Sequence, residues 1–496
     1  MEQEQILRHW DSWNGGIMCL ESREMFSSVK LRELTNEMVE IFESIGVRKG
    51  DIVALSLINT VTFPVCLMAL LHIKANPLLL SPNMTGHELS RLLGTFSFKW
   101  IVRNGNLPPL QGLDNALYEN IITNKLLTCE SRYTITRRKS DDYFALRQNG
   151  VIIHQTSGTY GRPMLCIRNQ SAAIAEAENY VRSIPTYNKI IIRITTPLYH
   201  AFSYGFGLMS AIITDSTLII DGSFNPKKLV KEETTETSDI LCVVPPMIRS
   251  FIQLKKRDAS YKLPKTVFYA GSSIQNQIAD DFMNAFGVNL FTILGSTETG
   301  AISTSYGCAE KGCGVGKPLK NVEIDIDNKT ENYNGFLGGD LKVKSSSMMQ
   351  GYCFDSKYGN IDWFSTGDLA ANDANGNLHI IGRKRDIINI GGVKIDPYEI
   401  EEVIMAYPGV DDCIAYPGIS QNNEEAIFVC ISSGIEIKIP ALLNYCGNIL
   451  SKHKLPSKII FLDKIPRAES GKCVKTLLPH YFNAKCHMYE RNPNES

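Results

Sequence analysis

The sequence predicts an α/β protein with a large N-terminal body and a small α+β C-terminal domain. Two patterns support the body: strand-like apolar runs alternate with helical spacing from residue 28 to 295, and Gly-rich antiparallel strands follow over 315–385. We therefore expect two α/β subdomains and a small antiparallel β module. A basic cluster, GRKRD, precedes a compact helix and strand pattern, so we place the boundary between domains 1–384 and 385–496.

The elements of the body follow from periodicity and from turn residues. Residues 28–48 carry apolar side chains on one helical face, and Gly46 closes that helix. Strands are then expected at 50–57, 99–104, 189–197, 216–222, 240–246, 266–271 and 288–295, with a helix at 61–75. Most of these strands end in Gly, Pro, Ser or Thr. Since ligands bind beyond the carboxyl ends of parallel strands, we expect several loops to form one site at that edge.

The later elements are shorter. Residues 322–327 and 341–345 predict strands of the antiparallel module. In the C-terminal domain we expect helices at 396–407 and 439–453, strands around 411–416 and 426–432, and a last helix after Lys472. The last ten residues are polar, and we expect them to be frayed.

Composition excludes several classes of protein. The 496 residues carry 51 Lys+Arg and 52 Asp+Glu, so the net charge of -1 argues against a nucleic-acid polymer as partner. The apolar stretch 61–80 is interrupted by proline, histidine and lysine, which favours a buried core helix over a membrane span. The 13 cysteines show no zinc-site spacing, and no secretory signal is visible at the start, so we expect a reduced, cytoplasmic protein without a Cys/His metal site.

Five motifs carry chemistry, and each has a plainer alternative. HQTSGTYGRP (154–163) offers backbone N–H groups and hydroxyls as a phosphate cradle, or is a polar hairpin turn. In LGSTETGAIS (294–303), Glu298 between two threonines suits Mg²⁺, or the run is an N-capped turn. Asp368 in WFSTGDLA suits ribose hydroxyls, or makes an Asx turn. The fourth motif is the basic, Gly-rich segment from residue 382, and its plainer alternative is a solvated linker. The fifth is the loop with Lys472, which is otherwise an exposed lysine.

Together and in this order, the motifs resemble those of the adenylate-forming superfamily, which includes acyl-CoA and aryl-CoA synthetases, adenylation domains and beetle luciferases. PLYHAFSYGFGL (197–208), FYAGSSI (268–274) and GVGKP (314–318) extend the resemblance over nearly the whole chain. It implies an ATP-dependent, AMP-forming acid–thiol ligase, which makes an acyl-AMP with release of pyrophosphate and then transfers the acyl group to a thiol. The cofactors implied are ATP, Mg²⁺ and either CoA or a phosphopantetheinyl carrier protein.

The resemblance also implies roles for individual residues. Thr297 would contact the α-phosphate, Glu298 would hold Mg²⁺, and Lys472 would bridge the carboxylate and the α-phosphate. The aromatic and small residues after Pro197 suggest that His200 lines the acid pocket, or they are ordinary packing. The nucleotide-binding positions are Thr156, Ser157, Gly158, Thr159, Gly161, Arg162, Gly271, Ser272, Gly295, Asp368 and Arg383. In the family the C-terminal domain rotates, so that either Lys472 or the loop of Gly391 and Gly392, which lines the thiol tunnel, enters the site. Arg385 occupies the hinge position.

Some residues depart from the family pattern. The phosphate loop usually has a threonine and two lysines at positions where this chain has Tyr160, Arg162 and Met164, in that order. An aromatic residue is usual at the position of Leu294. The run after Pro197 has no acidic partner for an ammonium group, which favours an uncharged acyl or aryl acid. No carrier motif is visible, so we expect CoA or a separate carrier protein as acceptor. The alternatives are a nucleotide- or acyl-binding regulatory protein with weakened catalysis and, on fold analogy alone, a luciferase-like oxygenase.

Overall fold

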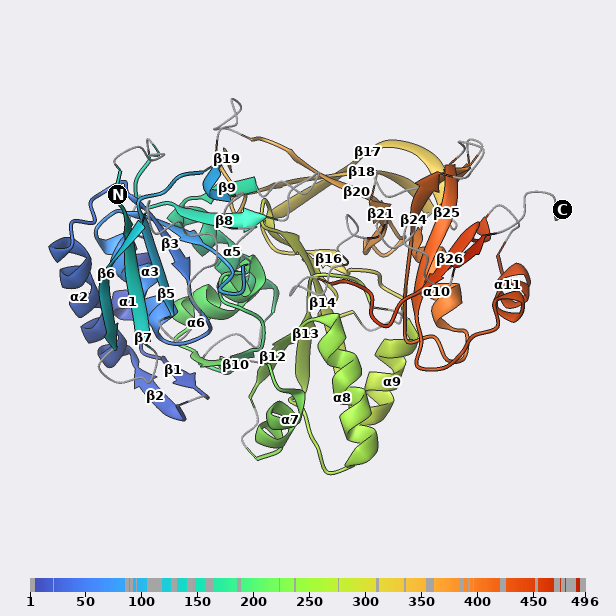
Figure 1. The fold of residues 1–496 in the computed structure, drawn as a ribbon, viewed down its shortest axis with the longest axis horizontal. Coiled ribbons are helices and arrows are strands. Elements are labelled where there is room, and N and C mark those ends of the chain that lie inside the picture. The colour runs from blue at the N-terminus through green and yellow to red at the C-terminus, as the bar shows by residue number, and fades with distance from the viewer. Residues whose placement is uncertain are drawn as a thin grey trace.

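A computed structural model describes the chain except for a set of short segments. Those segments are residues 1–4, 21, 85–88, 90–91, 95, 105–117, 126–131, 141–145, 147, 157–163, 185–188, 223, 236–237, 275, 309–311, 334–335, 354–360, 384–387, 391–392, 396, 420–424, 451–453, 468–472, 474–477, 479–487 and 491–496. Figure 1 shows the N-terminal elements at one end of the molecule, the C-terminal elements at the other, and a long antiparallel sheet running between them.

An eight-stranded mixed sheet forms the first α/β subdomain. Its strands, in spatial order, are β19 (Gly351–Tyr352), β9 (Met164–Arg168), β8 (Ile152–Thr156), β4 (Asn76–Leu79), β3 (Ile52–Ser56), β5 (Trp100–Asn104), β7 (Arg132–Arg138) and β6 (Tyr118–Lys125). The four central strands are parallel, and the outer ones pair antiparallel. The predicted strands at 50–57 and 99–104 are confirmed as β3 and β5.

A nine-stranded sheet forms the second α/β subdomain. Its order is β16 (Lys317–Pro318), β15 (Gly300–Thr304), β14 (Asn289–Ser296), β13 (Thr266–Tyr269), β12 (Ile240–Val243), β10 (Ile191–Ile194), β11 (Thr217–Ile220), β1 (Gly16–Cys19) and β2 (Glu24–Ser27). The strands from β14 to β1 are parallel. All five strands predicted between residues 189 and 295 are therefore present.

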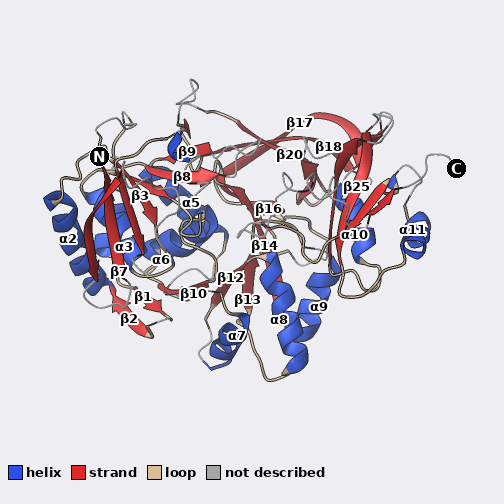
Figure 2. Cartoon of the chain, in the orientation of Figure 1, coloured by secondary structure: helices blue, strands red, loops and turns tan. Residues whose placement is uncertain are grey.

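Helices cover both sheets and pack in two apolar clusters. They are α1 (Gln5–Ser12), α2 (Ser28–Ser44), α3 (Thr62–His72), α5 (Gln170–Ser183), the π-helix η3 (Ser203–Met209), α6 (Ser210–Ile213), α7 (Pro226–Thr235), α8 (Pro245–Arg257) and α9 (Asn276–Phe286). Buried residues of α2, α3 and α5 join those of both sheets in one cluster, whereas α7, α8 and α9 lie together against the nine-stranded sheet (Figure 2).

Local signals explain where several helices begin and end. Ser27 caps α2 by accepting a hydrogen bond from the Lys30 N–H at 3.3 Å, and Gly46, at φ +92°, follows its end as predicted. The apolar stretch 61–80 becomes the buried helix α3 and the buried strand β4, which confirms a core role. No helix among the described residues is long and apolar enough to cross a bilayer.

The antiparallel module and the C-terminal unit have the predicted class. The module is β17 (Val322–Tyr333), β18 (Phe336–Ser345), β20 (Phe364–Asn372) and β21 (Leu378–Arg383). The C-terminal unit contains the hairpin β22 (Ile388–Ile390) and β23 (Val393–Ile395), the helices α10 (Pro397–Met405) and α11 (Ile439–Gly447), and a sheet of β24 (Asp412–Ile419), β25 (Glu425–Ser432), β26 (Lys458–Phe461) and β27 (Met488–Glu490). It packs its own apolar core.

Two predictions at the C-terminal end are wrong. The helix expected to reach residue 453 ends at Gly447, because the chain turns at Asn448, whose N–H bonds the carbonyls of Asn444 and Tyr445. Residues within the expected frayed end form β27, which pairs with β26. The proposed boundary at 384–385 and the start of the last helix lie outside the described residues.

Candidate active site

The Thr297–Glu298 turn joins β14 to β15 at the carboxyl edge of the nine-stranded sheet. Loops after β10, β12 and β13 leave from the same edge, because these strands are parallel to β14. The turn is internally braced: the Thr299 N–H donates to Ser296 Oγ at 3.2 Å. The sequence prediction of several loops at one edge is thus confirmed for the described part of the chain.

Backbone and side chains of the other subdomain hold this turn in place. The Cys166 thiol donates to the Thr297 carbonyl at 3.4 Å, and the Met349 N–H donates to the Glu298 carbonyl at 2.7 Å. The Tyr352 hydroxyl donates to Glu298 Oε1 at 2.9 Å and so orients the carboxylate. Burial, together with the nearby Glu298 carboxylate, raises the pKa of Cys166 well above its usual value, which keeps the thiol protonated as a donor.

The phosphate-loop motif spans the β8–β9 hairpin. Thr156 ends β8 and pairs with Met164 at the start of β9, so both ends of the loop are fixed by the sheet. Two residues further along β9, Cys166 makes the contact with Thr297 described above. The base of the loop therefore lies beside the Thr297–Glu298 turn. Ser157, Gly158, Thr159, Gly161 and Arg162 lie outside the described residues.

Asp368 and Arg383 lie opposite each other in the antiparallel module. They are paired residues of β20 and β21. Asp368 is 6% exposed, its N–H donates to Thr366 Oγ1 at 3.0 Å, and the preceding Gly367 has φ +74°. Asp368 therefore lies within β20, and the Thr366 hydroxyl fixes its backbone N–H.

Gly271 and Ser272 begin the loop after β13, where Gly271 adopts φ +100°, a conformation that favours glycine. The C-terminal unit touches this loop, because the Tyr398 hydroxyl donates to the Ile274 carbonyl at 3.1 Å. Burial raises the pKa of the neighbouring Tyr269 to about 12, so its hydroxyl stays protonated. Gly295 lies in β14, and a Cβ there would come within 2.7 Å of the Gly300 carbonyl.

Aromatic side chains surround His200 and the helix that follows it. The rings of Tyr199 and His200 are 4.3 Å apart, and the Phe206 ring lies 5.0 Å from Phe268 of β13. Asn59, which follows β3, accepts from the Leu198 N–H at 2.7 Å and donates to the Thr196 carbonyl at 3.0 Å. Asn59 therefore joins the first subdomain to the segment of the second that leads to His200. The helix after His200 packs among apolar and aromatic side chains.

The remaining predicted residues lie outside the described part of the chain. They are Arg385, Gly391, Gly392 and Lys472. Of Arg383, only the backbone is described. Sequence patterns do not identify four residues that contact this turn or lie beside it, namely Cys166, Tyr352, Ser347 and Arg168. Glu176, which forms a buried ion pair with Arg168, has one sequence signal: it lies on the apolar face of α5, among Ala172, Ala173 and Ala177.

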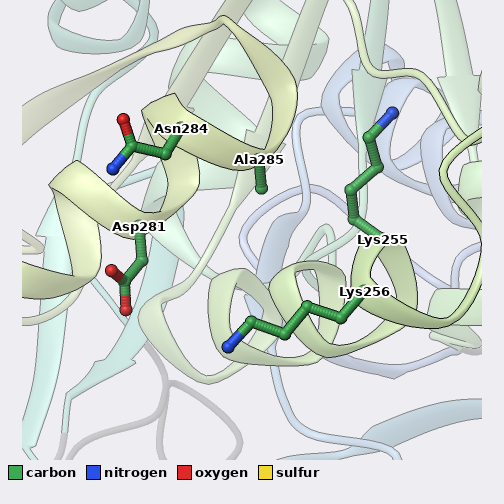
Figure 3. A pocket seen from close by; sticks show the side chains of 5 residues that line it. All are labelled: Lys255, Lys256, Asp281, Asn284 and Ala285. Atoms are coloured by element: carbon green, nitrogen blue, oxygen red, sulfur yellow. The ribbon is translucent and has the colours of Figure 1, made fainter.

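A shallow cavity elsewhere does not belong to this site. It has a volume of about 320 Å³ and is lined by Lys255 and Lys256 of α8 and by Asp281, Asn284 and Ala285 of α9 (Figure 3). Because α8 begins after the carboxyl end of β12 and returns along the sheet, its last turn lies toward the opposite edge. Lys255 is held there by the Ala259 and Tyr261 carbonyls.

Comparison with known proteins finds relatives along nearly the whole chain. An oxalate–CoA ligase of Arabidopsis thaliana is 24% identical over 466 residues, covering 89% of this chain and 90% of the relative. A 2-succinylbenzoate–CoA ligase of Geobacillus sp. is 24% identical over 480 residues, covering 92% and 93%. ATP-bound MatB from Rhodopseudomonas palustris superposes with a TM-score of 0.80 at 19% identity, covering 97% of this chain and 99% of that chain.

A second solved structure has the same fold. The O-succinylbenzoate coenzyme A synthetase MenE from Bacillus subtilis, in complex with ATP and magnesium ion, superposes with a TM-score of 0.79 at 20% identity, covering 96% of this chain and 98% of that chain. Residues 17–353 match the AMP-binding enzyme family, and residues 399–472 match its C-terminal domain. The chain therefore belongs to the AMP-binding enzyme family, the adenylate-forming superfamily whose motifs its sequence resembles.

Proposed function

We propose that this AMP-forming acid–thiol ligase activates an acyl or aryl acid with an uncharged tail and transfers the acyl group to CoA. The observation that carries the proposal is the Thr297–Glu298 turn, fixed by Cys166, Met349 and Tyr352 beside the base of the phosphate loop. A carboxylate oxygen of the acid attacks the α-phosphorus of ATP and pyrophosphate leaves. The CoA sulfur then attacks the acyl carbonyl, and AMP leaves.

The described residues suit the nucleotide in this reaction. Thr297 offers a hydroxyl to the α-phosphate at the turn, and Asp368 offers two acceptor oxygens to ribose hydroxyls. Gly271 and Ser272 would flank the adenine. Lys472 would place positive charge on the oxygens of the five-coordinate phosphorus, where negative charge builds up in the transition state.

The donor set also fits Mg²⁺. Glu298 offers a hard carboxylate oxygen, and its orientation is fixed by Tyr352 at 2.9 Å. No group of three or more His, Cys, Asp or Glu residues that could cage a metal is found among the described residues. This arrangement suits Mg²⁺, which typically uses one or two carboxylates together with substrate phosphates. When bound, the ion neutralises phosphate charge.

The acid and the thiol follow from two supporting observations. The segment that follows His200 is aromatic, and its Phe206 ring packs 5.0 Å from Phe268, which favours an apolar acyl or aryl tail. The relatives are named as CoA ligases, which favours CoA over a separate carrier protein. We therefore expect hexanoate or benzoate to be better substrates than oxalate or 2-succinylbenzoate, which carry a second carboxylate.

Acid-dependent exchange of pyrophosphate into ATP tests this function. With the four acids above, we expect exchange with hexanoate or benzoate, and thioester formation when CoA is added. Lys472→Ala should lower exchange by about a hundredfold or more, as for removal of a group that stabilises transition-state charge. Lys464→Ala, which changes an exposed lysine of the same unit, is the matched control and should leave exchange unchanged.

Two results would contradict the proposal. Absence of exchange with every acid in the wild-type enzyme rules out the ligase function. Unchanged exchange in a folded Lys472→Ala variant rules out the role of that lysine. Acyl transfer to a phosphopantetheinyl carrier protein, with none to CoA, would replace the proposed acceptor.

A further inference from the structure

A buried ion pair lies directly beneath the Thr297–Glu298 turn. Arg168, the last residue of β9, places Nη2 2.8 Å from Oε2 of Glu176 in α5, and the two side chains are 1% and 2% exposed. Burying two charges carries a large desolvation cost, which their mutual attraction offsets only when the geometry is good. An apolar pair would fill the same space, so stability alone gives little reason for charged residues here.

Glu176 holds the start of β15, directly after the turn, and Arg168 packs beside it. Glu176 Oε1 accepts from the Ala301 N–H at 3.2 Å, one residue after Gly300. Gly300 has φ +69°, and a Cβ at this position would lie 3.1 Å from Glu176 Cδ and 3.2 Å from Arg168 Nη2. The backbone of the turn therefore packs on the two charged groups without an intervening side chain.

A third residue links the pair to the carboxylate of the turn. Arg168 Nη2 donates to the Ser347 carbonyl at 2.8 Å, and the Ser347 hydroxyl donates to the Thr299 carbonyl at 2.8 Å. The same segment then supplies the Met349 N–H to the Glu298 carbonyl and the Tyr352 hydroxyl to Glu298 Oε1. Three successive carbonyls of the turn, those of Thr297, Glu298 and Thr299, are thus each fixed from outside.

The geometry points to Arg168, Glu176 and Ser347 as positioning residues that set where the Thr297–Glu298 turn meets Mg²⁺ and ATP. This inference rests on the proposed function, because it takes Glu298 as the magnesium-binding carboxylate. None of the three touches the reacting atoms. Loosening them should weaken the metal-dependent part of ATP binding and slow adenylation. It should slow acyl transfer from a preformed acyl-AMP to CoA less than adenylation, since the acyl-AMP keeps the α-phosphate that Thr297 would contact but lacks the pyrophosphate whose charge Mg²⁺ would neutralise.

Ser347→Ala is the principal test, because it removes one hydroxyl and keeps the ion pair. The affinity for ATP is measured by calorimetry with Mg²⁺ and again with EDTA, and the ratio of the two is the readout. We expect Ser347→Ala to reduce this ratio about fivefold, the effect of losing one neutral hydrogen bond. Glu176→Gln, which keeps an acceptor for Ala301 but removes the charge, should reduce it further.

Matched controls separate positioning from general stability. Ser303→Ala also removes a buried hydroxyl that donates to a carbonyl, that of Val315 at 2.9 Å. Asp221→Asn breaks a comparably buried pair with Arg193 of β10, which β12 and β13 separate from β14. Both should lower the melting temperature and leave the ratio unchanged.

Either of two results overturns the inference: a wild-type ratio in Ser347→Ala, or an equal loss in the two controls. Failure of the proposed function is distinguishable, because it shows as absent pyrophosphate exchange in the wild type, whereas the binding ratio is measured without any acid.

Discussion

His154 illustrates how strongly this interior controls a single titratable group. The side chain is 1% exposed in the middle of β8 and meets the ring of Tyr204 edge-on, at a centroid distance of 5.1 Å. Burial is the main cause that lowers its pKa to about 3, and the positive charge of Arg168 and the neighbouring His200 lower it further. His154 is therefore neutral throughout the physiological range, two residues before the phosphate loop.

This shift makes stability depend on pH. Below the ordinary histidine pKa of about 6.5, the unfolded chain binds a proton that the folded chain refuses until about pH 3. Stability is thus present above pH 6.5 and is lost as the pH falls. From pH 7 to 5.5 the group should remove about 1 kcal/mol of unfolding free energy. His154→Phe keeps the ring contact but cannot bind a proton, so its unfolding free energy should fall by about 1 kcal/mol less than that of the wild type over this pH range. Denaturant titrations of both proteins at pH 7 and 5.5 measure the difference. An equal fall in the two proteins would contradict the assignment.

At the residue scale, sequence patterns identify residues with a local signature and miss those that act across the fold. Glu298 and Asp368 stand in recognisable runs. The structure places Glu298 at the turn after β14, where Tyr352 orients its carboxylate, whereas Asp368 lies within β20 and not in a loop after a strand, as its sequence suggested. Tyr352 and Ser347 carry no such signature. Their significance comes from contacts with a turn about fifty residues earlier in the chain, which β19 creates by pairing with β9.

The connection between β15 and β16 shows why one of its glycines is needed at the element scale. Gly316 has φ +75°, and a Cβ there would lie 2.0 Å from the Thr304 carbonyl oxygen and 2.5 Å from Ser305 Cα. Gly307, in the same connection, has φ +80° but open space around it. A side chain at either position would have the same conformational cost, because both have positive φ. At Gly316 it would also clash with rigid backbone.

We therefore predict different costs for the two alanine variants. Gly307→Ala should destabilise the protein by about 1 kcal/mol, from the left-handed conformation alone. Gly316→Ala should cost more than about 3 kcal/mol, because the strand must move to admit the methyl group. Thermal melting of the two purified variants measures the difference. Equal melting temperatures would show that the connection adjusts freely.

Element prediction succeeded where packing and periodicity agree. The parallel strands from β10 to β14 are short apolar runs bounded by turn residues, and all were predicted. The β6–β7 hairpin was missed because its strands, with sequences such as YENIITNK, lack an apolar run. The end of α11 was placed too late because apolar spacing continues through Ile449 and Leu450, whereas the chain turns after Gly447.

At the scale of the whole molecule, hydrogen bonds between described residues join the C-terminal unit to the body. The Arg249 guanidinium of α8 donates to the Asp411 carbonyl, and Tyr398 of α10 donates to the Ile274 carbonyl at 3.1 Å. Both pairs join residues more than a hundred positions apart. No sequence pattern signals them, although the class of each unit was predicted correctly. The second contact reaches the loop of Gly271 and Ser272, the loop that we propose flanks the adenine.

Transfer of an oxygen atom tests the central claim most directly. If the acid carboxylate attacks the α-phosphorus, one of its oxygens must remain on AMP when the thiol displaces it. With hexanoate or benzoate labelled with ¹⁸O in the carboxylate, ATP, Mg²⁺ and CoA, mass spectrometry should therefore find one ¹⁸O in each AMP and none in pyrophosphate. Label in inorganic phosphate with formation of ADP, or unlabelled AMP, would contradict an adenylate-forming ligase.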